Sequence, residues 1–352
     1  KRVHNGKPSE GHLCVKCHMP GRYYMGTDYR PDHSLRIPRP DLSARLDTPN
    51  ACSAKGCHAD KPLSWNVDHY TKWYGESQKP HYGEVLAAGR SQKPEAEANL
   101  IRLAEDPLVP TIVRSTALEL LRSYPTPASQ ATLAKALEDN DALIRYTAIR
   151  SLEYFDAETR LKRIAPKLYD PVKAVRMEAA MMLSVLPKEQ LREDDQEAFE
   201  EGLAEYRDAM LYNADLAPQR YNLGNLATNL GDNQQAVTAY EKSIAIDARF
   251  YPAKVNLAIL YNRQGKNHEA EKLLREVVES EPELYEVSYS LGLLLAEMQQ
   301  YQDAERYLGS AAAGMNYGRA HYNHGQVLLV LNQPSRAEQA LQTALSLAPQ
   351  EQ

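Results

Sequence analysis

The feature that most constrains this chain of 352 residues is a run of internal repeats in its C-terminal half. From about residue 200, a large residue followed by a small one recurs every 34 residues, or 33 at the last step. The four pairs are Leu223-Gly224, Leu257-Ala258, Leu291-Gly292 and His324-Gly325. A fixed period of this length indicates helical hairpins that stack in a row, because one hairpin cannot bury its own apolar face.

Two further positions keep the same phase within each unit. Thirteen residues after the first member of each pair come Ala236, Ala270, Ala304 and Ala337, and four residues later come Tyr240, Leu274, Leu308 and Leu341. This is the tetratricopeptide pattern, in which small residues let the two helices of a hairpin approach and large residues fill the space between hairpins. We expect four units over residues 217–350, with Pro282 and Pro349 closing two of them, and a degenerate half unit around Tyr206 and Ala209.

A shorter period of 31 residues precedes this array, from about residue 86 to 190. It relates Arg114, Arg145 and Arg176, then Ala117, Ala148 and Ala179, and finally Leu121, Leu152 and Leu183. We expect each register to follow a helix start led by an aspartate, at Asp106, at Asp139 or Asp141, and at Asp170. The pattern resembles short HEAT-type repeats. Residues 187–200 are charged and contain neither Gly nor Ser, so they indicate a solvated helix and one continuous α-solenoid.

The first 85 residues have a different character. They contain eight prolines and show no sustained helical period, which indicates mostly loop. All four cysteines lie before residue 58, and seven of the ten histidines lie before residue 86. A loop-rich stretch cannot build a core from its own side chains, so a prosthetic group is expected to supply the apolar mass. The predicted domains are residues 1–85, 86–199 and 200–352.

The first cysteine pair forms the run Cys14-Val15-Lys16-Cys17-His18, the Cys-x-x-Cys-His motif of covalent haem attachment. The two thiols form thioethers to the haem vinyl groups, and the histidine offers an imidazole to the iron. The second pair, Cys52 and Cys57 followed by His58, has four intervening residues, and Gly56 gives this longer loop freedom to bulge. Two covalent haem c groups are therefore expected. A structural zinc bound by the four thiolates and two disulfides are the alternatives, but neither needs a histidine after each pair.

Two haems have two further axial positions. The candidates to fill them are His33, His4, His81 and His69, whereas His12 lies too close to Cys14 to cross its own haem. Met19 and Met25 are alternative ligands that would raise the reduction potential. Tyrosines and tryptophans crowd the same zone, and we expect them to pack on porphyrin rather than to relay electrons.

The N-terminal runs resemble multihaem c-type cytochromes that carry C-terminal tetratricopeptide repeats. The matching runs are Cys14 to Pro20, Asp32-His33-Ser34, Ile37 to Ser43, Pro49 to Cys52 and Trp73-Tyr74-Gly75. The resemblance implies an exported protein, in the periplasm or outside the cell, and further haem motifs usually precede this block in the family. The chain begins with neither Met nor an apolar segment, so we expect a processed product or a fragment.

Three functions compete at this point. The first is an electron carrier with two bis-histidine haems, which the solenoid docks to redox partners, to other multihaem cytochromes or to its own copies, a polymer included. The second is an enzyme that acts on small nitrogen or sulfur compounds at an open haem; no residue marks such a site, so an electron carrier is expected instead. The third is an assembly protein, in which an aromatic ladder of Tyr221, Tyr289 and Tyr322 lines the tetratricopeptide groove and grips a partner.

Charge and hydropathy remove other classes of partner. The formal net charge is −6 and no basic stripe is present, which excludes nucleic acid as an expected ligand. No run reaches the roughly 18 apolar residues of a membrane span. The last repeat has no polar capping helix after it, so we expect its open face to be covered by another chain.

Overall fold

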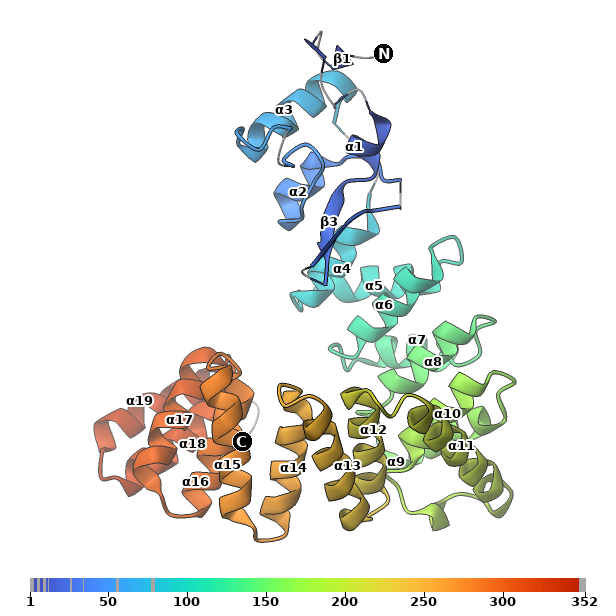
Figure 1. Ribbon diagram of the computed structural model, residues 1–352. Helices are drawn as coiled ribbons and strands as arrows, with labels where there is room; N and C mark the ends of the chain where they lie inside the picture. Colours follow the sequence, from blue (N-terminus) through green and yellow to red (C-terminus); the bar gives the residue numbers. More distant parts are fainter. Residues whose placement is uncertain are drawn as a thin grey trace. The chain divides into compact units, whose positions relative to one another are not determined.

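The computed structural model describes the backbone of residues 3–4, 7–8, 11, 13–25, 27–33, 35–54, 57–76 and 80–347, and their side chains except at 3–4, 7–8 and 22 (Figure 1). The chain forms two compact units, Lys1–Tyr154 and Phe155–Gln352, and each is treated separately below. The structure is mostly helical, as the sequence predicts. The proposed domain boundaries at 85/86 and 199/200 stay predictions, and α11 (Glu193–Tyr212) runs across the second of them.

The first unit begins with short elements. They are β1 (Val3–His4), β2 (Lys7–Pro8), α1 (Cys14–His18), β3 (Gly21–Tyr24), β4 (Asp28–Pro31), α2 (Pro40–Leu46) and α3 (Leu63–Tyr74). β1 and β2 pair antiparallel, and so do β3 and β4, where Tyr23 lies opposite Tyr29. Neither hairpin nor the 12-residue helix α3 is expected from the sequence. Among its described residues, the side chain that this helix buries is a polar one, Asn66.

The remainder of the first unit consists of α4 (Tyr82–Arg90), α5 (Ala96–Glu105), α6 (Thr111–Leu121), α7 (Pro127–Ala136) and α8 (Ala142–Ser151). The 31-residue register marks α6 and α8 here and α10 in the second unit. Its alanine and leucine positions are buried as predicted, because they form the inner faces of these helices. Its arginines bind the backbone: Arg145 donates to the carbonyl of Asp139 at 2.8 Å, and Arg176 to that of Asp170 at 2.8 Å.

The prediction of aspartate-led helix starts holds at one of its three places. Asp141 caps α8 by accepting a hydrogen bond from the Leu143 amide. Asp106 instead accepts from the Leu108 amide in a turn that ends before α6 begins at Thr111. Asp170 makes the same kind of turn with Val172, one residue before α10. An aspartate bonds an amide two residues on equally well in a turn, so the residue type alone does not fix the helix start.

The second unit is a continuous row of helices. They are α9 (Ala157–Ile164), the 3-10 segment η2 (Ala165–Tyr169), α10 (Lys173–Leu183), η3 (Lys188–Gln190), α11 (Glu193–Tyr212), α12 (Ala217–Asn229), α13 (Asn233–Ile246), α14 (Tyr251–Arg263), α15 (Asn267–Ser280), α16 (Tyr285–Glu297), α17 (Tyr301–Gly314), α18 (Gly318–Val330) and α19 (Pro334–Leu347). Each helix from α10 onward packs against the next. The repeats of period 31 therefore pass into those of period 34 with α11 as a shared helix.

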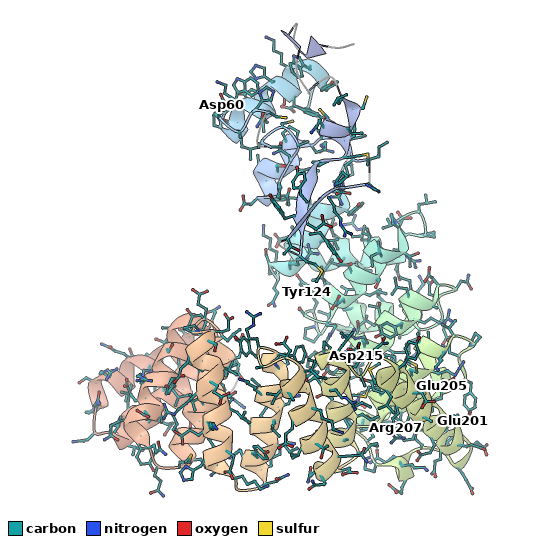
Figure 2. All side chains as sticks on the ribbon, in the orientation of Figure 1. Asp60, Tyr124, Glu201, Glu205, Arg207 and Asp215 are labelled. Carbon is teal, nitrogen blue, oxygen red and sulfur yellow. The ribbon has the colours of Figure 1, made fainter. Side chains whose placement is uncertain are left out.

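The charged segment 187–200 is helical but not fully solvated. Asp195, near the start of α11, is buried and forms an ion pair with Arg192 at 2.7 Å. The Tyr169 hydroxyl bonds the same carboxylate at 3.1 Å. Farther along, Arg176 forms an ion pair with Glu205 of α11. Glu205 is labelled in Figure 2. These contacts hold α11 against the preceding helices.

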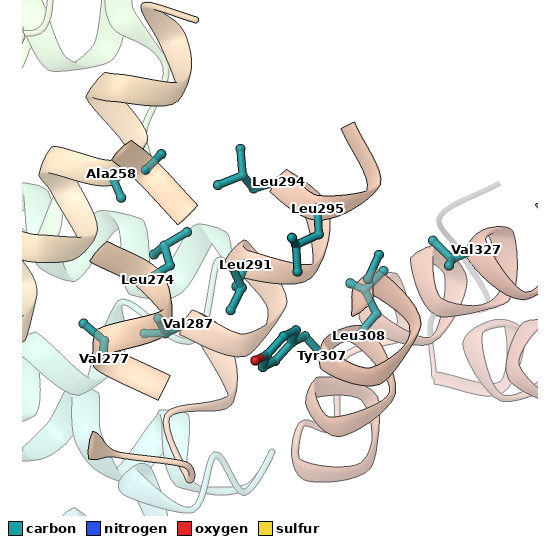
Figure 3. Packing of buried hydrophobic residues seen from close by; sticks show 12 residues of the cluster. Ala258, Leu274, Val277, Val287, Leu291, Leu294, Leu295, Tyr307, Leu308 and Val327 are labelled. Atoms are coloured by element: carbon teal, nitrogen blue, oxygen red, sulfur yellow. The ribbon is translucent and has the colours of Figure 1, made fainter. Parts of the chain in front are cut away.

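The four expected tetratricopeptide hairpins are α12–α13, α14–α15, α16–α17 and α18–α19. In three of them the small residue of the first helix lies against the large residue of the second: Gly224 faces Tyr240, Gly292 faces Leu308 and Gly325 faces Leu341. The positions occupied by Ala236, Ala270, Ala304 and Ala337 are completely buried. A cluster of twelve buried residues joins α14 to α18 without a break (Figure 3). The predicted packing scheme is therefore present.

Candidate functional site

The first cysteine motif is a single turn of helix. In α1, Cys14, Cys17 and His18 stand three and four residues apart, so they share one face. Cys14 is exposed, and Cys17 and His18 are half-buried. The His18 Nδ1 atom bonds the Arg36 carbonyl at 2.8 Å, and the Arg36 amide bonds the His18 carbonyl at 2.8 Å. A carbonyl only accepts, so Nδ1 carries the proton and Nε2 presents its lone pair. This is the tautomer of a histidine that binds a metal through Nε2.

The second motif is a loop whose described residues are 52–54 and 57–58. Its ends are joined by a hydrogen bond from the His58 amide to the Cys52 carbonyl, at 3.1 Å. His58 is thereby held beside Cys52 in spite of the longer spacing between the cysteines. Residues 55 and 56, and with them the expected role of Gly56, lie outside the described residues.

Two asparagines that the sequence does not single out position this loop. Asn50 accepts hydrogen bonds from the amides of Cys52 and Ser53, at 2.9 and 3.2 Å. Asn66, buried on α3, donates to the Ser53 hydroxyl at 2.9 Å. The loop of the second motif is therefore tied to α3. From the sequence, the role of Asn66 could be suspected only because a polar residue lies among the aromatic residues of this segment. That indication is weak.

The two motifs lie close to each other. Burial raises the pKa of the Cys17 thiol, and the nearby thiols of Cys57 and Cys14 raise it further. Burial also raises the pKa of Cys52, with Cys17 and Cys57 as the next causes. None of the four cysteines, all of which are described, forms a disulfide. Among the described residues, which include all four cysteines, no three His, Cys, Asp or Glu side chains converge as a metal-ion site.

The four candidate axial histidines have different surroundings. His33 is exposed in a turn after β4, and for His4 only the backbone, in β1, is described. His69 is half-buried on α3, and its Nδ1 bonds the Trp65 carbonyl at 2.8 Å. His81 is the N-cap of α4, and its Nδ1 accepts a hydrogen bond from the Gly83 amide at 3.0 Å. His12 lies outside the described residues.

Aromatic rings connect the second motif to α3. The imidazole of His58 lies 4.7 Å from the indole of Trp65, measured between ring centroids. Trp65 stacks on His69 at 3.9 Å, and His69 contacts Trp73 at 6.0 Å. Asp60, labelled in Figure 2, marks the loop between His58 and α3. The geometry thus places His58 and His69 against the same indole.

The N-terminal segment exposes its large apolar side chains. Among its described residues from 13 to 82, the buried apolar side chains are Pro40, Leu42 and Ala51. Exposed large ones are Leu13, Val15, Tyr23, Tyr24, Met25, Tyr29, Leu35, Ile37, Trp73, Tyr74 and Tyr82. Planar aromatic side chains such as these suit the faces and edges of a porphyrin.

The predicted aromatic ladder of the tetratricopeptide array is partly structural. The hydroxyl of Tyr221 accepts a hydrogen bond from Asn256 at 3.2 Å, and that of Tyr289 accepts one from Asn323 at 2.7 Å. In both cases the asparagine belongs to the next first helix of the array, 34 or 35 residues on. These two tyrosines therefore join neighbouring repeats, whereas Tyr322 is half exposed.

Comparison with known proteins identifies the repeats. Two tetratricopeptide repeat families match, one at residues 227–287 and the other at residues 289–351. No curated protein matches the sequence. Within the part of the chain that the structure describes, no helix has the length and apolar character needed to cross a membrane.

Solved structures of similar shape include several forms of MamA. One, titled a crystal structure of MamA, is 15% identical with a TM-score of 0.40, over 44% of this chain and 92% of that one. A second, residues 41 to the end of MamA from Desulfovibrio magneticus RS-1, is 20% identical with a TM-score of 0.39, over 44% and 88%. The matched repeats make the C-terminal part of the chain a tetratricopeptide scaffold, a fold that presents extended surfaces for protein–protein contacts.

Proposed function

We propose that the chain is an electron-transfer c-type cytochrome with two covalently attached haems, which its tetratricopeptide scaffold docks to a protein partner. The observation that carries the proposal is the presence of two thiols and one imidazole in each of two neighbouring motifs. The first of these imidazoles is held with its Nε2 lone pair available. The exposed aromatic residues around the motifs fit the same group.

Each cysteine and histidine of the two motifs has a role in this proposal. Cys14 and Cys17 would hold one haem, and Cys52 and Cys57 would hold the other. His18 and His58 would each offer an imidazole to an iron, and further histidines of the segment would offer the others. When bound, a haem with imidazole on both faces supplies one-electron transfer and leaves no open position for a substrate. That arrangement favours a carrier over an enzyme.

The same proposal gives a location and a class of partner. Covalent haem attachment of this type and the resemblance to exported cytochromes support a location in the periplasm or outside the cell. The partner is a redox protein, another multihaem cytochrome or a further copy of the chain. The scaffold supports contact with a protein surface, since arrays of this fold bind through their extended faces.

Counting the attached haems tests the proposal. The full chain is produced in cells that carry out c-type haem maturation, and its intact mass is measured beside haem staining of a denaturing gel. The expected masses correspond to two haems in the native chain and to one in each of the variants Cys14→Ser/Cys17→Ser and Cys52→Ser/Cys57→Ser. A native chain without covalent haem contradicts the proposal. A native chain with one haem, lost only with the first pair, contradicts it for the second motif.

A further inference from the structure

Hydrogen-bond partners fix the tautomers of two candidate axial histidines in opposite ways. The Nδ1 atom of His69 bonds a backbone carbonyl, that of Trp65, at 2.8 Å. Because a carbonyl has no proton to give, Nδ1 of His69 carries the hydrogen and the lone pair is at Nε2. His18 has the same arrangement with the Arg36 carbonyl. Both rings are therefore prepared to bind a metal through Nε2.

His81 has the other tautomer. Its Nδ1 faces the Gly83 amide at 3.0 Å, and an amide nitrogen only donates, so Nδ1 holds the lone pair and Nε2 carries the proton. Ligation through Nε2 would require the proton to move to Nδ1, and α4 would then lose its N-terminal cap. The local backbone therefore stabilises the form of His81 that does not bind iron through Nε2.

The position of His69 relative to the second motif is also fixed. Its ring stacks on Trp65, whose indole also contacts the ring of His58. One turn of α3 carries both Asn66 and His69, and Asn66 anchors the motif loop through Ser53. The helix thus holds a correctly protonated imidazole beside the second motif.

We propose that His69 supplies an axial imidazole to the haem carried by Cys52 and Cys57, and that His81 serves as a helix cap. The proposal rests on the proposed function, since it assigns a residue to a haem whose attachment is itself proposed. It selects one of four candidates that residue type alone does not separate. Trp65 acts as a positioning residue, because its carbonyl sets the tautomer and its ring orients the imidazole.

Paired substitutions with a spectroscopic readout test the assignment. His69→Phe keeps an aromatic ring against Trp65 but removes the ligand, and His69→Ala removes both. His81→Asn removes an imidazole and keeps a capping side chain, so it is the matched control. Each variant is matured in the full chain, its covalent haems are counted by intact mass, and its spin state is followed by visible absorption and electron paramagnetic resonance.

Both His69 variants are expected to retain two covalent haems while about half of the low-spin signal converts to high-spin, since one of two irons loses a strong-field ligand. Imidazole added to His69→Ala is expected to restore the low-spin spectrum, which shows that the fold persists. His81→Asn is expected to stay fully low-spin. Two low-spin haems in both His69 variants, or a high-spin haem in His81→Asn, overturn the assignment. Absence of covalent haem from the native chain overturns the proposed function instead.

Discussion

At the scale of single residues, one ion pair at the start of α2 makes the stability of the N-terminal segment depend on pH. The guanidinium of Arg39 donates two hydrogen bonds of 2.7 Å to the carboxylate of Asp41, and Arg45 adds a third contact at 3.1 Å. The hydrogen bond from Arg39 is the main cause that lowers the pKa of Asp41 to about 2. Both partners are largely buried, so solvent screens the pair less than it screens a surface pair.

Replacement of Asp41 by Asn is expected to remove stability in a defined pH range. A carboxyl group whose pKa is lowered on folding stabilises the protein above its unfolded pKa near 4, and this contribution disappears as the pH falls through about 2. The variant should be less stable than the native chain by roughly 1–2 kcal/mol at pH 5, and the difference should vanish near pH 2. Urea unfolding followed by fluorescence of Trp65 and Trp73 reports on this segment.

Asp47→Asn is the control for this experiment, because it removes the same charge from the exposed end of α2. The free energy of unfolding of this control should stay close to that of the native chain both at pH 5 and near pH 2. A constant difference between the Asp41 variant and the native chain from pH 5 to pH 2 would argue against the ion pair as the cause.

Sequence identifies the reactive residues of the candidate site but not what orients them. Cysteine and histidine spacing is a covalent property, so Cys14, Cys17 and His18 can be recognised directly. The tautomers of His18 and His69 depend on the carbonyls of Arg36 and Trp65, and a carbonyl is present at every position of the chain. Only the folded backbone decides which carbonyl an imidazole meets.

At the scale of elements, close approach within a hairpin depends on the pairing of one small residue with one large one. A Cβ atom added at Gly224 would lie 2.5 Å from the ring of Tyr240, which cannot bend away. The equivalent positions of the next unit hold Ala258 and Leu274, which belong to one buried cluster. The second unit thus accommodates an alanine opposite a leucine, whereas a Cβ atom added at Gly292 or Gly325 would lie 2.7 or 2.8 Å from the facing Leu308 or Leu341.

The effect of a Gly224→Ala substitution on the free energy of unfolding should depend on residue 240. In the native chain the clash is expected to cost about 1–3 kcal/mol, which outweighs the gain of up to about 1 kcal/mol from replacing glycine inside a helix. In a Tyr240→Leu background the same substitution should be less destabilising, because the ring that the added Cβ atom would meet is gone and the Ala and Leu pair of the second unit is recreated. A double-mutant cycle on urea unfolding, followed by circular dichroism, measures this coupling.

Ala258→Gly serves as the matched control, since it relieves no clash and should destabilise the array by about 1 kcal/mol. Equal effects of Gly224→Ala in both backgrounds would contradict the pairing rule.

The repeat registers are the elements that sequence predicts best. Alanine and leucine recur at buried positions because every hairpin packs against its neighbours in the same way. The same packing requirement therefore selects the same residue types in each repeat. Helix α3 and the β3–β4 hairpin occur once, and their exposed aromatic residues show neither helical nor strand periodicity. The aspartate turns at Asp106 and Asp170 fail as predictors because the same side-chain bond serves a turn and a cap.

At the scale of the whole molecule, two parts of the chain differ in how many buried apolar contacts stabilise them. The tetratricopeptide array has buried clusters in successive hairpins, and its folding needs only contacts between neighbouring helices. The described residues 13–76 bury three apolar side chains, Pro40, Leu42 and Ala51, so their own core is too small to fix them. Attached haems would supply the missing apolar contacts.

Under the proposed function, the two parts should therefore respond differently when the attachment of the two haems is prevented. A variant with serine at Cys14, Cys17, Cys52 and Cys57 is compared with the mature chain by hydrogen exchange and mass spectrometry. Peptides from residues 217–347 should keep their protection in both proteins, because their buried contacts are unchanged. Peptides from residues 13–76 should lose most of their protection in the variant, since few buried groups remain to oppose local opening. Undiminished protection of residues 13–76 without haem would mean that this segment folds on its own contacts, and the structural role assigned to haem would then be wrong even if electrons still pass through it.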